Sequence, residues 1–476
     1  MLKATLRGAV LLGLLAWSLP SFAEVQNVRV GGDVTVRAFH RECMDLNCGD
    51  DNGGSVAAPT NVQDEQDDFI MQTTGVNVGA DLTENVSTFV RVASERDWDG
   101  TAANGTENVT DIDISQAYIT LKEMFSSPLT LRVGTQPIMW GRGFVLGSNL
   151  LPSVAKNVGD RNGAITPNEY TDFTAFDAIR ATLDLSSLTG AMPLSLDLVY
   201  IKLDENTAGL PDDVNLVGFN LTSRFEDAHS EAELYFLNKR DKNVSAQNAF
   251  AALVLANNDN KGSVNTLGIR GSSQPIEGVN IFGELAYQFG QRAVDPDGVL
   301  IAGDAQQAWA TDLGLEYTFA NVATSPKLGF EWIFWSGKDV NGAVSGWDPI
   351  ARGYYTTPLR EFQTGANTGF YPTPQAGDTA AATNQHELSW YGSLKYEDLS
   401  IAPRLSLFVL DRGAIPVAGS KRKRYAGFEW DTIVTYNYTE DVQLGFMYAL
   451  FAPGSVYRQP NDSPAQELVT TVGVKF

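Results

Sequence analysis

The chain has 476 residues, with 34 basic and 57 acidic side chains and a net charge of −23. So acidic a chain is a poor partner for nucleic acid, which binds to basic surfaces. Hydrophobic residues make up 43% and aromatic residues 10% of the chain. After the N-terminal segment, no apolar run reaches the roughly 20 residues that a membrane-spanning helix needs.

The N-terminus carries the pattern of a secretory signal peptide. Two basic residues precede an apolar run (9–17), and Ser21-Phe22-Ala23 forms a small-x-small cleavage site. The apolar run is too short to span a bilayer as a helix. We therefore expect residues 1–23 to be a signal peptide and residues 24–476 to form the exported barrel.

The chain contains two cysteines, Cys43 and Cys48, which lie in an acidic segment (40–68). In an exported protein, such a close pair usually forms a local disulfide. Two thiols are too few to hold a metal ion, and the three histidines are scattered along the sequence. We expect a disulfide between Cys43 and Cys48, no metal site and no cofactor.

From residue 28 onward, apolar and polar residues alternate in the manner of half-buried strands. In the segment 279–290, for example, Ile281 and Leu285 share one face while Asn280 and Glu284 share the other. The pattern predicts eighteen strands: 28–38, 69–82, 86–96, 112–122, 129–136, 172–185, 194–203, 214–225, 230–240, 263–272, 279–290, 308–319, 327–336, 386–396, 399–410, 427–438, 442–452 and 467–476. In the fourth strand the apolar parity changes between Ile114 and Ile119, as at a β-bulge.

Short connections alternate with long ones along this series of strands. The short ones include 83–85, 397–398 and 439–441, and the long ones include 137–171 and 337–385. Outer-membrane barrels show this alternation, with short periplasmic turns and long extracellular loops. We therefore predict an all-β fold, a transmembrane antiparallel β-barrel of about 18 strands, in the bacterial outer membrane and in contact with its lipid and lipopolysaccharide.

The last predicted strand ends on an aromatic residue, in the sequence "LVTTVGVKF". An open sheet edge of this kind would be an aggregation hazard in water. We expect the strand 467–476 to pair with the first strand, so that the barrel closes and Phe476 faces lipid. A terminal aromatic strand also resembles the recognition signal for the barrel-insertion machinery, which is therefore an expected partner.

The polar faces of the strands would line the lumen, where charged side chains set the selectivity of a pore. All the basic residues that this register points inward are arginines: Arg91, Arg132, Arg180, Arg224, Arg270 and Arg404. The inward acids are Asp184, Glu284, Asp312, Glu316, Glu331, Glu429 and Asp431. Arginine suits bidentate binding to carboxylates, and these can belong either to the wall or to a substrate. A further basic run, "KRKR" (421–424), lies in an outer loop and is expected to contact lipopolysaccharide phosphates or, alternatively, an acidic polymer.

Three stretches resemble the alginate export family of outer-membrane proteins: "LRVGTQPIMWGRG" (131–143), "FDAIRATLDL" (176–185) and "GFEWDTIVTYNYTEDVQLGFMYALFAPG" (427–454). The resemblance implies an eighteen-stranded barrel with an arginine-rich lumen that passes an anionic uronate polymer. It carries a pore-lining role to the positions that match these motifs: Arg132, Arg142, Arg180, Glu429 and Asp431. This chain departs from the family in having as many inward acids as bases.

Together these features predict an outer-membrane channel that passes acidic saccharides or an anionic exopolysaccharide, and not an enzyme. The predicted pore-lining, substrate-binding residues are Arg91, Arg132, Arg142, Arg180, Arg224, Arg270, Arg404, Glu284, Glu316, Glu331, Glu429 and Asp431. No Gly-x-Ser-x-Gly or His-Glu-x-x-His motif indicates a catalytic site. The alternatives are a general or cation-preferring diffusion porin and, less favoured, a barrel scaffold for adhesion.

Overall fold

The computed structural model of the chain describes residues 27–44, 46, 66–98, 112–148, 170–190, 192–204, 213–225, 229–241, 262–291, 305–337, 346–363, 383–414, 421–457 and 462–476. The predicted signal peptide, residues 1–23, and Cys48 lie outside these residues. Cys43, which is described, is bonded in a disulfide.

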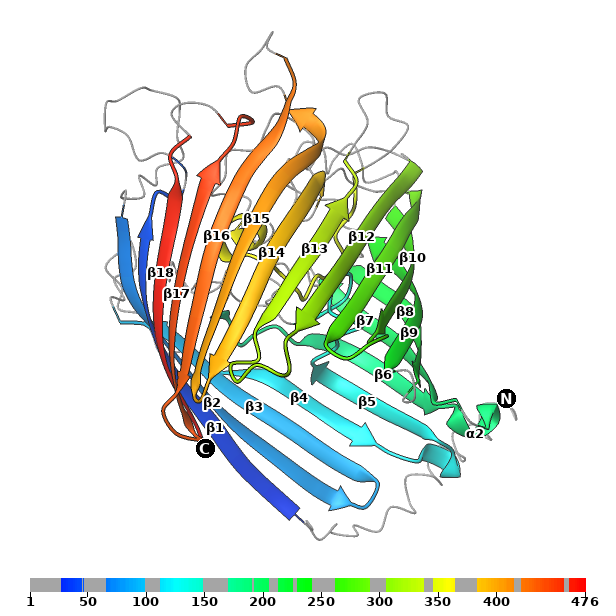
Figure 1. The fold of residues 1–476 in the computed structure, drawn as a ribbon. Coiled ribbons are helices and arrows are strands. Elements are labelled where there is room, and N and C mark those ends of the chain that lie inside the picture. The colour runs from blue at the N-terminus through cyan, green and yellow to red at the C-terminus, as the bar shows by residue number, and fades with distance from the viewer. Residues whose placement is uncertain are drawn as a thin grey trace, which may run out of the picture.

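Eighteen antiparallel strands form one closed barrel, as Figure 1 shows. Each strand pairs with its neighbours in the sequence, and β1 also pairs with β18. The strands are β1 (Asn27–Glu42), β2 (Gln66–Thr83), β3 (Val86–Asp97), β4 (Asp113–Leu121), β5 (Leu129–Gln136), β6 (Phe176–Asp184), β7 (Leu194–Asp204), β8 (Val214–Phe225), β9 (Ser230–Asp241), β10 (Gly262–Ser273), β11 (Val279–Gln291), β12 (Ala305–Thr318), β13 (Lys327–Trp335), β14 (Gln385–Tyr396), β15 (Leu399–Ala414), β16 (Lys423–Asn437), β17 (Val442–Pro453) and β18 (Ala465–Lys475). The predicted barrel of eighteen strands is confirmed.

The described residues include three short helical turns: η1 (Met124–Ser126), α2 (Ser186–Thr189) and the π-helical turn η4 (Pro358–Gln363). In the described part of the chain, no helix has the length and apolar character needed to cross a membrane.

Alternation along the strands gives the barrel an apolar outer face and an inner face with buried charged and aromatic side chains. On β13, Leu328 is 60% exposed on the outer face, whereas Glu331 and Trp335 on the inner face are 1% exposed. Aromatic residues such as Trp309, Trp430 and Tyr438 stand on the outer face, where they are 47%, 47% and 66% exposed. Such a surface is stable when it meets lipid instead of water.

The structure corrects the ends of some predicted strands. The predicted strand 172–185 begins only at Phe176, because Asp172 turns inward to bind the side chain of Arg91. The parity change in the fourth strand is a bulge, since Arg91 pairs with Gln116 and the next residue pairs with Ile114. The predicted bulge is therefore present.

The short connections lie at the end of the barrel that holds the C-terminus and α2, the lower end in Figure 1. We call this the turn end and the opposite end, where the long connections lie, the loop end. At the turn end Phe476 closes the seam, because its backbone exchanges hydrogen bonds of 2.9 and 3.0 Å with Gly32. A Cβ on Gly32 would lie 2.8 Å from the Phe476 ring and 2.5 Å from the carbonyl oxygen of Gly75, so only glycine fits there.

Candidate functional site in the barrel lumen

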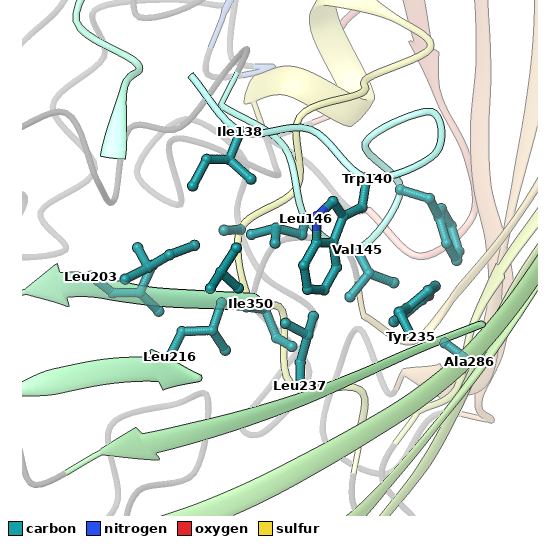
Figure 2. Packing of buried hydrophobic residues seen from close by; sticks show 14 of the residues in the cluster. Ile138, Trp140, Val145, Leu146, Leu203, Leu216, Tyr235, Leu237, Ala286 and Ile350 are labelled. Carbon is teal, nitrogen blue, oxygen red and sulfur yellow. The ribbon is translucent and has the colours of Figure 1, made fainter. Parts of the chain in front are cut away.

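Parts of two long loops lie inside the barrel and pack on its inner wall. The parts that the structure describes are 137–148 and 346–363, and we call them together the plug. They meet each other in a parallel bridge between Leu146 and Ala351. Figure 2 shows Trp140, Val145, Leu146 and Ile350 of the plug beside wall residues of β7, β8, β9 and β11: Leu203, Leu216, Tyr235, Leu237 and Ala286.

Polar wall residues hold the second segment of the plug by its backbone. Gln288 donates to the carbonyl oxygen of Asp348 at 2.7 Å, and Gln306 donates to that of Gly346 at 3.1 Å. Glu429 accepts from the backbone N–H groups of Leu359 and Arg360 at 2.7 and 2.6 Å. These bonds satisfy backbone groups that the lumen would otherwise leave unpaired.

The inner wall carries a band of charged and polar residues that follow one another around the barrel, which we call the inner belt. Successive members are neighbours in strand register or joined by side-chain bonds, except that Asp312 and Glu331 are joined through Arg142, which contacts both: Arg132, Arg180, Asp197, Asn220, Glu233, Arg270, Glu284, Asp312, Glu331, Arg404 and Asp431. Most of the predicted pore-lining residues therefore belong to one continuous arrangement.

Arg142, at the tip of the first plug segment, connects the plug to the acidic side of the belt. Its guanidinium lies 2.9 Å from Glu331 and 3.5 Å from Asp312, and it donates to the hydroxyl of Tyr354 at 2.9 Å. Burial by itself would lower the pKa of Arg142, but the carboxylates of Glu331 and Asp312 raise it above its usual value, so the group stays charged. Burial and Glu331 likewise raise the pKa of Tyr354, which keeps its proton and donates to Glu331.

Four of the predicted arginines are paired with carboxylates of the wall or of the segment just before β6. Arg91 lies 2.8 Å from both Asp33 and Asp172. Arg270 contacts Glu231 and Glu233, and Arg404 lies 3.2 Å from Glu331. Arg224 is 75% exposed at the turn end, with Glu231 at 3.7 Å.

Arg132 of β5 is the exception, and its neighbour is Arg180 of β6. Arg132 and Arg180 stand directly opposite each other in the strand register. Arg180 contacts Asp197 at 2.5 Å, but Arg132 has no carboxylate within 4.0 Å among the described residues. Like charges opposite each other on neighbouring strands are unfavourable, so this part of the lumen keeps an excess of positive charge.

The predicted acids occupy three kinds of position: in the belt, nearer the turn end and against the plug. Glu284 is buried in the belt and accepts from the hydroxyl of Tyr235 at 2.6 Å. Glu316, nearer the turn end, accepts from Tyr391 at 2.9 Å and lies 3.5 Å from Lys327. Glu429 holds the plug, and Asp431 lies opposite Arg404 on the next strand.

Several residues of the site were absent from the prediction. Asp197, Glu233 and Glu387 lie on predicted strands, and their alternation with apolar neighbours could have found them. Arg352 and Arg360, which are 3% and 6% exposed, lie on the plug. No strand periodicity extends to the plug, and only the folded loop brings them to the wall.

Other predicted features stand apart from the belt. The basic run 421–424 is exposed at the loop end, before and at the start of β16. Within the described ranges, no group of three or more His, Cys, Asp or Glu side chains could hold a metal ion.

Comparison with known proteins identifies relatives at the level of family and fold. The family model described as alginate export matches residues 57–471. Among solved structures, the chain resembles Acinetobacter baumannii OccAB2, with 12% identity, a TM-score of 0.55 and coverage of 95% of this chain and 99% of that one. It also resembles Pseudomonas aeruginosa OccK8 (OprE), with 10% identity, a TM-score of 0.53 and coverage of 95% and 98%. At these identities the likeness is one of fold, and no curated protein matches the chain.

Proposed function

The chain belongs to the alginate export family and is a channel-type barrel of the bacterial outer membrane, and on this premise we propose that it passes acidic saccharides or an anionic exopolysaccharide. The family match covers most of the chain, including all three stretches that carry the resemblance. The family match does not identify the substrate class, so support for an anionic substrate has to come from the arginines of the lumen.

The observation that carries the proposal is the arginine pair of β5 and β6. A wall that used arginines only as structural braces would give each one a carboxylate, as it does for Arg91, Arg270 and Arg404. Arg132 lacks such a partner among the described residues and faces a second arginine. Positive charge maintained at this cost is expected where the missing carboxylates arrive with the substrate.

A second candidate, the cation-preferring diffusion porin, is favoured by the opposite side of the belt. Glu284, Asp312 and Glu331 are all buried there, with further acids from β14 and β16. The arginines beside these three are Arg142, Arg270, Arg352 and Arg404. A negative excess on this side would attract cations into the lumen. The balance between the two sides decides the selectivity.

Electrical recording of the channel tests the proposal. The double variant Arg132→Gln/Arg180→Gln removes both charges of the pair and keeps most of their length. In planar bilayers, the unmodified channel should prefer anions in a salt gradient, and uronate oligomers should block its current. The block should weaken with salt, because accessible charges are screened over about 10 Å at 0.1 M ionic strength.

The double variant should shift the reversal potential toward cations and should be blocked less. An unmodified channel that prefers cations and ignores uronates would contradict the proposal and favour the diffusion porin.

A further inference from the structure

We propose that Arg132 is a preorganised binding site for a single carboxylate group, and that Thr120 and Tyr118 are the residues that position it. The inference deepens the proposed function and rests on it, since the carboxylate is that of a passing uronate sugar. It goes further in assigning the recognition to one guanidinium and to two uncharged neighbours on β4.

The neighbours fix the orientation of the guanidinium. Its Nε donates to the hydroxyl oxygen of Thr120 at 3.2 Å. Its central carbon lies 4.6 Å from the ring centroid of Tyr118. Tyr118 in turn stacks on Phe89 of β3, with ring centroids 5.3 Å apart and 25° between the ring planes. Phe89, Tyr118 and the guanidinium therefore form a stacked column across three strands.

This arrangement uses one edge of the guanidinium and leaves the other. Because Nε is bonded to Thr120, the two terminal nitrogens remain for a ligand, and no described carboxylate lies within 4.0 Å of them. Two parallel N–H groups match the two oxygens of a carboxylate. A guanidinium already held by stacking loses little conformational freedom when it binds, so its position favours affinity.

Arg180 strengthens the attraction for an anion at the same place. It lies opposite Arg132 in the register, and its Nη2 is bonded to Asp197 at 2.5 Å. Its Nε is buried without a hydrogen-bond partner. Among the described residues, the pair therefore presents two guanidinium groups with one carboxylate between them.

A cavity lies at the turn end of β3 and β4. Its volume is about 320 Å³, and its lining includes Arg29, Asp81, Ser87 and Lys122. Ser87 lies opposite Thr120 in the strand register, and Lys122 follows Thr120 by two residues, on the same face of the chain. The cavity therefore lies between the turn end and Thr120, where an anionic sugar that enters from the turn end would pass.

The test distinguishes binding through the two terminal N–H groups of the guanidinium from attraction by its positive charge alone. Arg132→Lys keeps the charge but loses the planar fork, so the reversal potential in a salt gradient should stay close to that of the unmodified channel. Block by glucuronate oligomers added at the turn end should weaken about tenfold, as expected for one lost charge-assisted hydrogen bond.

Two variants test the positioning residues in the same recording. Thr120→Val keeps the shape but removes the acceptor for Nε, and Tyr118→Leu removes the stacking face. Each should weaken the block several-fold without changing the reversal potential, whereas Tyr118→Phe should behave like the unmodified protein. Thr88→Val is the matched control, because its hydroxyl bonds only the backbone oxygen of Tyr118, at 3.3 Å. It should leave the block unchanged.

The outcomes distinguish this inference from the proposed function. Single-channel recording reports only folded, inserted channels, so a loss of folding does not imitate a loss of binding. If uronates block the unmodified channel and block Arg132→Lys equally well, the proposed carboxylate site at Arg132 is wrong, while the proposed anionic substrate is still supported. If uronates do not block the unmodified channel at all, both are wrong.

Discussion

At the scale of single residues, one carboxylate controls much of the positive charge in the centre of the lumen. Glu331 contacts both Arg142 of the plug and Arg404 of β15, at 2.9 and 3.2 Å, and it also accepts from Tyr354. Its side chain is fully buried. Glu331 is thus a shared counter-ion, and its charge masks two guanidinium groups from any substrate.

Replacing this carboxylate should make the channel more selective for anions. Glu331→Gln keeps the size of the side chain and its hydrogen-bonding capacity, but leaves Arg142 and Arg404 without their shared charge. We expect the reversal potential to shift toward anions and uronate block to become stronger. Glu316→Gln, at a carboxylate bonded to Lys327, Asn280 and Tyr391, measures the effect of losing one acid alone. An equal shift in both variants would contradict the role of Glu331 as a shared counter-ion.

The sequence allowed the inward arginines to be predicted, but not their partners. Alternation alone placed Arg132 and Arg180 on the inner face, since Val133 and Ile179 beside them are apolar and exposed on the outer face. That the two arginines lie directly opposite each other depends on the register of β5 and β6, which the long intervening loop does not reveal. The role of Arg142 came only from the family resemblance, because it lies outside any strand.

At the scale of elements, the plug has its own packing requirements. Its two segments approach each other at Gly147 and Gly353, where a Cβ on either residue would lie within 2.7 Å of the other backbone. Only glycine permits this contact. Phe144 stacks on Trp335 of the wall with ring centroids 4.3 Å apart, so the plug is a packed element of the structure.

The attachment of η4 to the wall can be tested through Glu429. Glu429→Ala leaves the backbone N–H groups of Leu359 and Arg360 without their acceptor. An unsatisfied buried group costs about 1–3 kcal/mol, so this segment should move more freely. Single-channel traces should become noisier and the mean conductance should rise.

The control for this variant is Gln443→Ala. Gln443 is exposed near the turn end of β17 and bonds Asn437, so its loss does not touch the plug. A quiet, unchanged trace for Glu429→Ala would show that the hydrophobic packing alone holds η4.

Local periodicity was enough to find the strands, because one face of each strand meets an apolar environment whatever its partners are. The plug could not be found in this way. The prediction treated the inner face as polar, yet Ile201, Leu216 and Leu237 face inward and are fully buried against the plug. Inward apolar residues on neighbouring strands make sense only when a loop from elsewhere in the sequence covers them.

At the scale of the whole molecule, closure joins the two ends of the chain. β1 pairs with β18 over ten residue pairs, from Asp33 opposite Lys475 to Glu42 opposite Gln466. A closed barrel has no free edge strand, which answers the aggregation hazard that the terminal sequence raised. Closure also fixes which connections lie at which end of the barrel. The side of the membrane on which one connection lies therefore gives the orientation of the whole barrel.

Labelling of intact cells should show that the turn end faces the periplasm. Lys421→Cys introduces a thiol at an exposed position at the loop end, and Glu440→Cys introduces one in the exposed turn between β16 and β17. A membrane-impermeant maleimide should modify the first in intact cells and the second only after the outer membrane is opened, because short turns lie on the periplasmic side of such barrels. The native Cys43 is bonded in a disulfide and gives no background. Labelling in the reverse order would place the Arg132 site at the outer entrance of the channel, and an anionic polymer would then meet it last on export and first on uptake.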